Sequence, residues 1–188
     1  DNVERAIKRG TGEGTEAQHF DEITYEGYAP GGVAVIVEAA TDNRNRTAAE
    51  IRSIFAKNHG NLASNGSVSY MFHRKGQIVV PSSSIGEEKI FELALEAGAE
   101  ELTNQEDRYL IMTAPDQLYA VAEALRKAGV TTESQKFTFI PDTTITVADE
   151  SVAQQVLRLC DALEDDDDVQ NVYSNLEISD EMLAKLPA

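Results

Sequence analysis

Two arginines and two asparagines stand together just before a predicted helix, and their chemistry suits an anion. Arg44 and Arg46 supply forked guanidinium donors, with Asn43 and Asn45 beside them. The N-terminus of a helix adds backbone N–H groups and a favourable dipole. The segment therefore predicts a site for a phosphate or for a partner's carboxylate. In the alternative interpretation, Asp42 pairs locally with the arginines and the asparagines satisfy the loop backbone.

A second unusual segment is the glycine-rich connection at residues 26–33, which joins two predicted strands. Its Tyr28, Pro30, Gly31 and Gly32 exceed what a plain hairpin requires. One interpretation is a functional loop. The other is a wide turn with Tyr28 packed over it.

The motifs of common catalytic and metal sites are missing from the sequence. The histidines, His19, His59 and His73, stand far apart without a paired cysteine, which disfavours zinc. No serine lies in a Gly-x-Ser-x-Gly elbow, and no phosphate-binding loop ends in Gly-Lys-Ser/Thr. The run Asp165–Asp168 lacks the glycine and the distal glutamate of a calcium loop, so a solvated turn is favoured. We expect no catalytic residue, metal or cofactor, and a protein that is not an enzyme.

Charge is divided unevenly along the chain. Residues 1–76 carry nine Lys/Arg against ten Asp/Glu, whereas residues 77–188 carry seven against twenty-three. The second part would repel a phosphate backbone, so nucleic acid should contact the first part. The cations predicted to make that contact are Arg5, Lys8, Arg9, Arg44, Arg46 and Lys57. The acidic part could instead dock a basic protein partner.

The sequence also indicates a cytoplasmic protein that does not enter a membrane. No apolar run is long enough to cross a bilayer, and the start has no signal-peptide character. The single cysteine, Cys160, cannot form an internal disulfide, which fits a reducing compartment. Cys160 lies in an apolar stripe with helical spacing and is expected to be a buried structural thiol.

Periodicity in the first part predicts three strands and one helix. Residues 20–28 alternate between apolar and polar side chains, with Glu26 on the polar face of a half-buried strand. Residues 33–37 form a more apolar strand. The capping box that begins at Thr47 starts the helix, and residues 68–73 form the last strand.

The pattern restarts after residue 76 in the order β-α-β-β-α-β, which is typical of a ferredoxin-like unit over residues 77–140. Its first strand is expected at residues 78–80. Its first helix is expected to turn Ile90, Phe91, Ala94 and Leu95 towards the core.

The elements that follow residue 140 are too few to fold alone. Residues 144–147 and 169–176 read as strands on either side of the helix that carries Cys160. One helix and two strands bury too little surface for independent stability. We therefore expect an α+β chain, in which residues 19–76 and 141–188 form one discontinuous α/β domain and the ferredoxin-like unit is its insertion.

Several segments resemble the YebC/PmpR family, in order along essentially the whole chain. They are residues 4–10, 25–34, 41–47, 60–62, 66–68 and 167–175. Family members are similar in having a basic helical N-terminal domain, followed by an α/β domain with a ferredoxin-like insertion. The resemblance implies that residues 1–18 hold the end of a helix and a hinge to that helical domain, which this chain is expected to lack.

The resemblance implies regulation of gene expression, at one of two levels. Bacterial members are described as DNA-binding transcriptional regulators, and this is the leading hypothesis. The mitochondrial translational activator of cytochrome c oxidase subunit I is related, and some bacterial relatives are linked to ribosomes stalled on proline-rich sequences. The alternative is therefore a ribosome-associated translation factor that binds RNA. A basic face without base-reading side chains predicts salt-sensitive, weakly selective binding.

A further alternative is a small-molecule sensor, because ferredoxin-like units also serve as regulatory domains. It predicts a pocket beside Ile78, Phe91 or Tyr109. The nucleic-acid hypotheses have a different requirement, namely that the arginines face water rather than neighbouring acids.

Overall fold

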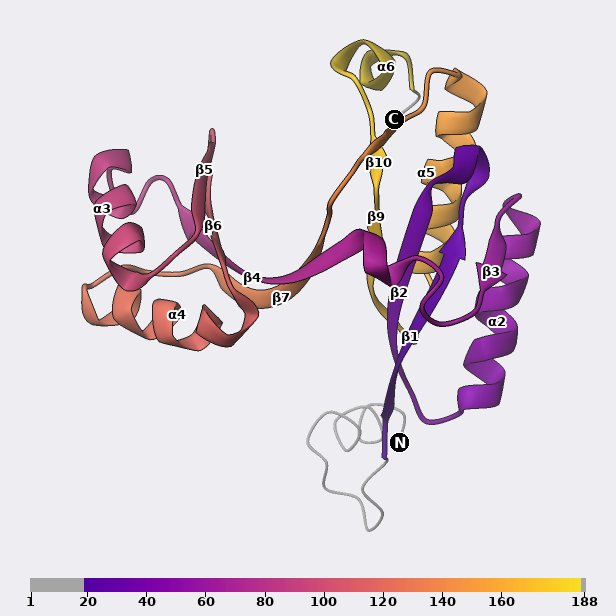
Figure 1. The fold of residues 1–188 in the computed structure, drawn as a ribbon, viewed down its shortest axis with the longest axis horizontal. Helices are drawn as coiled ribbons and strands as arrows, with labels where there is room; N and C mark the ends of the chain where they lie inside the picture. Colours follow the sequence, from indigo (N-terminus) through magenta and orange to yellow (C-terminus); the bar gives the residue numbers. More distant parts are fainter. Residues whose placement is uncertain (1–18, 187–188) are drawn as a thin grey trace, which may run out of the picture. The chain divides into compact units, whose positions relative to one another are not determined.

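The computed structural model describes residues 19–186, which divide into two compact units (Figure 1). Unit 1 combines residues 19–70 with residues 143–186, and unit 2 spans Met71–Asp142. The predicted fold class is confirmed, since a ferredoxin-like unit is inserted into a discontinuous unit of helices and strands. Across the described part of the chain, no helix combines the length and the apolar character needed to span a bilayer.

Unit 1 is built on a four-stranded antiparallel sheet with the order β3-β1-β2-β9. Its strands are β1 (Asp21–Tyr28), β2 (Ala34–Thr41), β3 (Asn61–Ala63) and β9 (Val169–Ser174). The strand β2 is the most apolar and lies at the centre, as its composition indicates. Because β9 comes from the C-terminal part of the chain, the sheet is complete only when both segments of unit 1 meet.

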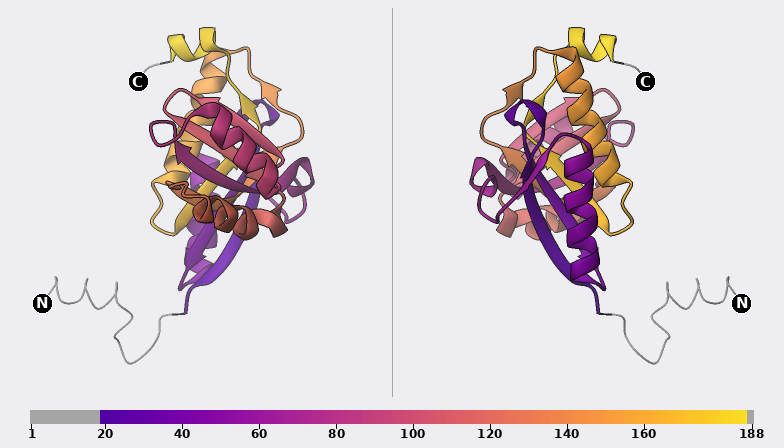
Figure 2. Two further views of the ribbon diagram at one scale, coloured as in Figure 1. Left: turned by 90° about the vertical axis from the view of Figure 1, so that its left-hand side faces the viewer. Right: turned by 90° about the vertical axis from the view of Figure 1, so that its right-hand side faces the viewer.

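Two amphipathic helices, α2 (Arg44–Lys57) and α5 (Glu150–Glu164), cover one face of this sheet (Figures 1 and 2). Their buried side chains form a single core with alternate residues of β2. That core contains Val33, Val35, Val37, Ile51, Phe55, Ala153, Val156, Leu159 and Leu163. Cys160 packs against the core but is only partly buried, and burial raises the pKa of its thiol to about 11.

Shorter elements complete unit 1. The 3-10 turn η1 (Pro30–Gly32) joins β1 to β2, and η2 (Ser69–Met71) ends the first segment of the unit. The two-residue strands β8 (Ile145–Thr146) and β10 (Leu176–Glu177) pair in parallel, and the helix α6 (Asp180–Lys185) follows them.

Unit 2 has a second antiparallel sheet, with the order β5-β6-β4-β7. Its strands are β4 (Phe72–Pro81), β5 (Glu101–Gln105), β6 (Arg108–Thr113) and β7 (Ser134–Pro141). This is the strand order of the ferredoxin-like fold, with the first and third strands at the centre.

Two helices of unit 2 pack on its sheet: α3 (Glu87–Ala97), and α4 (Leu118–Lys127), which follows the turn η3 (Pro115–Gln117). On α3 the buried side chains are Ile90 and Ala94. The prediction for the rest of this helix face was wrong, because Phe91 is 53% exposed and Leu95 is 64% exposed.

The predicted strands at 68–73 and 78–80 were wrong in their boundaries, because β4 runs without a break from Phe72 to Pro81. Gly76, which resembles a turn signal in the sequence, lies in the middle of this strand. A Cβ at this position would collide with Thr113 and Leu118, so Gly76 is required for close packing.

Two further predictions in unit 1 were also wrong. The helix α2 begins at Arg44, and its N-cap is Asn43 instead of Thr47. Glu26 lies in β1 as predicted, yet it is only 4% exposed instead of facing solvent. The reason is the chain that follows β3, which covers Glu26 and donates backbone hydrogen bonds to it.

The glycines near the end of β1 are explained by packing. A Cβ on Gly27 would come within 2.5 Å of the Phe55 ring and 2.7 Å of the Asn61 carbonyl oxygen. Backbone and a buried ring cannot both move away, so only glycine fits beneath α2 at this point.

We therefore predict that Gly27→Ser destabilises the fold by about 1–3 kcal/mol, because it overpacks the core. The matched control is Gly86→Ser, at the N-cap of α3, where a Cβ would meet nothing within 4 Å. Serine is a good N-cap residue, so the control should lose no stability. Urea denaturation of both variants checks this, and equal losses would contradict the packing argument.

Candidate functional site

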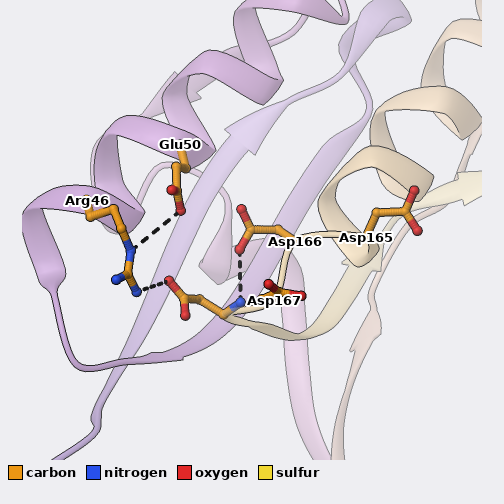
Figure 3. A pocket seen from close by; sticks show the side chains of 6 residues that line it. Arg46, Glu50, Asp165, Asp166 and Asp167 are labelled. Carbon is orange, nitrogen blue, oxygen red and sulfur yellow. Dashed lines mark hydrogen bonds and ion pairs between the residues drawn. The ribbon is translucent and has the colours of Figure 1, made fainter. Parts of the chain in front are cut away.

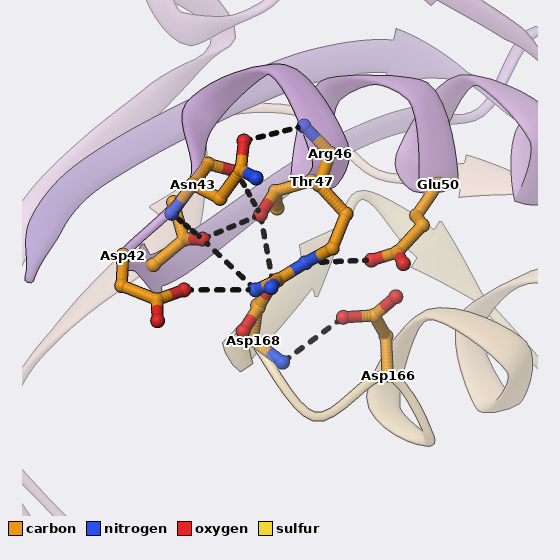
Figure 4. A network of polar contacts seen from close by, with 8 residues as sticks. Asp42, Asn43, Arg46, Thr47, Glu50, Asp166 and Asp168 are labelled. Carbon is orange, nitrogen blue, oxygen red and sulfur yellow. Dashed lines mark hydrogen bonds and ion pairs between the residues drawn. The ribbon is translucent and has the colours of Figure 1, made fainter.

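The arginine-rich loop, residues 41–47, leads into the first turn of α2. Its side chains form a dense polar network at the N-terminus of that helix (Figure 4). Arg46 donates from Nη2 to Asp42 Oδ1 at 3.1 Å and to Asp168 Oδ2 at 3.0 Å. Its Nε lies 4.0 Å from Glu50 Oε2. Its side chain keeps 44% of its surface exposed, but its charge is already shared among three carboxylates.

Asp168 is the centre of this network. Its Oδ2 also accepts a hydrogen bond of 2.7 Å from the hydroxyl of Thr47, and Thr41 Oγ1 lies 2.7 Å from the same hydroxyl. Both threonines are fully buried. The Thr47 hydroxyl and the Arg46 guanidinium hold the pKa of Asp168 below its ordinary value, against the effect of its partial burial.

The geometry of the loop matches the local alternative in part, since Asp42 pairs with Arg46 and Asn43 bonds the loop backbone, whereas Arg44 pairs with Asp21. Asn43 accepts a hydrogen bond from the backbone N–H of Arg46 at 3.1 Å and so caps α2. Its own N–H donates to Thr41 Oγ1 at 2.9 Å. The anion predicted at this helix terminus is therefore present within the chain itself, as the carboxylate of Asp168.

The other predicted cations do not converge on this point. Arg44 has a 64% exposed side chain, whose Nε lies 3.4 Å from Asp21 Oδ2. Lys57 is exposed at the far end of α2, which spans about 20 Å. Asn45 is also exposed. Arg52, which the sequence analysis did not select, is a further exposed cation of the same helix.

Three of the predicted cations, Arg5, Lys8 and Arg9, lie outside the described residues, as do the helix end and the hinge predicted at residues 1–18. The contribution of that segment to nucleic-acid binding stays a prediction.

A pocket of about 410 Å³ opens beside Arg46 (Figure 3). It is lined by Arg46, Glu50, Asp165, Asp166, Asp167 and Asp168. Five carboxylates against one guanidinium make this a poor site for phosphate. Oxygens of Glu50, Asp166 and Asp168 lie within 4.8 Å of one another. The Arg46 guanidinium stands beside them, and the Asp166 carboxylate accepts the Asp168 N–H at 3.0 Å.

The glycine-rich connection is a packed turn. The Tyr28 hydroxyl donates to the Ser67 carbonyl at 3.2 Å, while Pro30, Gly31 and Gly32 form η1, which lies against α5. A Cβ on Gly31 would come within 3.1 Å of Val152, and the φ of Gly31 is 78°. Both the close packing and the left-handed backbone conformation therefore favour glycine.

Glu26 is a buried carboxylate that the sequence did not reveal as special. Burial alone would raise its pKa, but backbone N–H groups of Gly66, Val68 and Ser69 donate to it and lower the pKa below its ordinary value. It thereby fixes the segment that leads from β3 to η2. No sequence pattern identifies it, because a glutamate in an alternating strand normally faces water.

The residues proposed to line a sensor pocket do not share one. Ile78 and Tyr109 are part of the unit 2 core, whereas Phe91 is exposed on α3.

We predict that Asp168→Asn lowers the free energy of unfolding by about 1–2 kcal/mol at neutral pH, because it removes a charged partner of Arg46 and Thr47. The pKa of Asp168 is lowered by folding, so its stabilisation is complete above the unfolded pKa of about 3.9. It disappears as the pH falls through the folded pKa. Denaturation from pH 7 to pH 2 should show the wild type and the variant converging in acid.

The matched control is Asp107→Asn, which removes the same charge from an exposed pair with Arg108. It should leave stability nearly unchanged at neutral pH. A loss for Asp168→Asn that is no larger than that of the control would contradict the role of Asp168.

Comparison with known proteins places this chain in a family. The profile described as "TACO1/YebC second and third domain" matches residues 20–176. A "Probable transcriptional regulatory protein" of Rubrobacter xylanophilus is 52% identical over 99% of this chain and 74% of its own length. A protein of Persephonella marina with the same name is also 52% identical, with the same coverage.

The fold has a close counterpart among solved structures. The crystal structure of a conserved hypothetical protein, Aq1575 from Aquifex aeolicus, superimposes with a TM-score of 0.83. It is 51% identical in sequence, and the match covers 97% of this chain and 74% of that one. The resemblance drawn from the sequence motifs is confirmed, and the chain belongs to the TACO1/YebC family.

Proposed function

We propose that this chain belongs to a non-enzymatic regulator of gene expression that binds nucleic acid in the cytoplasm. The observation that carries the proposal is the name of its relatives. Proteins about half identical to it over 99% of its length are called probable transcriptional regulatory proteins. The leading form of the proposal is a DNA-binding regulator of transcription.

The most suitable contact surface in the described residues is α2. This helix carries four Lys/Arg against a single acid, Glu50. All four cations are exposed, and Arg44, Arg52 and Lys57 are those outside the Asp168 network. Arg44 and Arg52 lie about 12 Å apart along the helix and about 80° apart around it, which suits contacts with neighbouring phosphates, whereas Lys57 points about 140° away from both.

Arg46 has a different role in this proposal. Its guanidinium is engaged by Asp42, Asp168 and Glu50, so a phosphate would have to displace existing ion pairs. We therefore assign nucleic-acid contact to the cations of α2 other than Arg46. Arg46 itself supports the loop before β9.

The charge distribution favours a second candidate, a translation factor that binds ribosomal RNA. Residues 77–188 have sixteen more acidic than basic residues, which disfavours lying flat along a duplex. A ribosome also offers basic proteins beside its RNA, so an acidic region can be accommodated there.

Charge reversal on α2 tests the proposal. Arg44→Glu with Arg52→Glu should weaken binding of duplex DNA or ribosomal RNA by about tenfold or more at low salt. It should also lower the slope of log affinity against log salt concentration by the equivalent of about two phosphate contacts. Fluorescence anisotropy over a range of salt concentrations measures both quantities.

The matched control is Lys89→Glu with Arg126→Glu, which changes the net charge equally at exposed positions of unit 2. It should have a much smaller effect. Equal effects of the two pairs would mean that net charge alone matters and would reject α2 as the contact. Tighter binding to ribosomes than to any DNA would favour the translation alternative.

A further inference from the structure

The helix α3 of unit 2 exposes an apolar pair that its own fold does not use. Phe91 is 53% exposed and Leu95 is 64% exposed, while Ile90 and Ala94 fill the core. Phe91 and Leu95 are four residues apart, so their side chains are neighbours on the helix surface. Together they form a small apolar ridge along one flank of α3.

A hydrogen bond shows which way this flank faces. Glu87 accepts a bond of 3.0 Å from Asn104 Nδ2 of β5. Glu87, Phe91 and Leu95 follow one another at steps of four residues, and each step turns by only about 40° around the helix. Ile90 and Ala94 mark the core side of α3, and each of these steps turns away from it. Phe91 therefore lies nearer to the edge of the sheet than Leu95, which faces solvent. The helix itself lies beside β5 (Figure 1).

The strand β5 is an open edge. It pairs with β6 alone, and in the described chain no other strand lies against its outer side. Four of its five residues are exposed, and its sequence, Glu-Leu-Thr-Asn-Gln, contains neither lysine nor proline. These are the residues that commonly protect an edge from pairing with another chain. Glu101 is the single charge on this strand, so the edge is only weakly protected. An open edge beside an apolar ridge has the form of a site for strand addition.

The charges around this edge decide which partner fits. The helix α3 carries four glutamates against Lys89, which lies 3.8 Å from Glu92. Glu101 stands on β5 itself, and Glu106 and Asp107 form the turn that follows. A second copy of the chain would bring these carboxylates face to face. A basic segment would instead pair with them.

We propose that the edge of β5 and the ridge of Phe91 and Leu95 bind an extended, basic segment of a partner protein by β-strand addition. Its backbone hydrogen-bonds to β5, and its apolar side chains turn towards α3 and cover Phe91. Its alternate Lys or Arg side chains lie on the opposite face of the sheet with Glu101, because Leu102 and Asn104 are the β5 residues on the helix side. This surface shares no residue with the nucleic-acid contact that we propose on α2.

The test uses the intact chain, labelled with ¹⁵N, and a short end-blocked peptide of alternating lysine and valine. Amide shifts should change at residues 101–105 and along α3. The same peptide with glutamate in place of lysine should not bind. A version of the lysine peptide that is N-methylated along its pairing edge should bind at least about tenfold more weakly, because it cannot extend the sheet.

Two variants place the site. Phe91→Ser with Leu95→Ser changes only exposed side chains and should weaken peptide binding by about tenfold. The control Leu183→Ser alters a 60% exposed leucine of α6 and should have no effect.

Four results would overturn the proposal: no binding of the lysine peptide, equal binding of its N-methylated form, equal binding by the ridge variant, or shift changes confined to other elements. Dimerisation of the free chain through β5, detected by sedimentation and lost on peptide addition, would assign the edge to a second copy instead.

Discussion

The structure of unit 1 depends on a carboxylate that joins two distant segments of the chain. The hydrogen bond from Thr47 to Asp168 connects residues 121 positions apart, with the whole of unit 2 between them in sequence. Next to it, the Ala40 N–H donates to the Asp168 carbonyl, where β2 and β9 shift in register. Asp168 therefore fixes the start of β9 against both the sheet and α2. The ends of the insertion meet each other at a separate place, where Phe72 pairs with Pro141 and the Asp142 N–H donates to the Met71 carbonyl.

The same junction changes what the arginine-rich loop means for function. A guanidinium near a helix N-terminus is equally suited to a phosphate and to a carboxylate, and only the fold decides between them. Here Asp168 reaches the helix and Arg46 becomes part of the scaffold. In our proposal the other cations of α2 contact the polyanion, because the five carboxylates beside Arg46 disfavour phosphate there. The acids of unit 2 have a different proposed role, which is to attract a basic protein segment.

The sequence predicted the main helices and the inserted ferredoxin-like unit, because both rest on local periodicity and on the size that a domain needs. It did not predict the short strand β3 or the helix α6. It failed where a residue's role depends on a distant segment. Gly76 resembles a turn yet packs within β4, and Glu26 lies on the polar face of a strand yet is buried by the chain after β3. Of the network at α2, the sequence predicted only the local contacts, those of Asp42 and Asn43. Nothing in the sequence pairs Asp168 with Thr47.

The central claim is that Arg46 serves the junction and not nucleic acid. A double-mutant cycle of Arg46→Gln and Asp168→Asn, measured by thermal unfolding and by nucleic-acid affinity on the same four proteins, tests it most directly. We expect the double variant to lose clearly less stability than the two single variants together, and Arg46→Gln to leave the affinity nearly unchanged. Additive losses of stability, together with a large fall in affinity for Arg46→Gln, would contradict it.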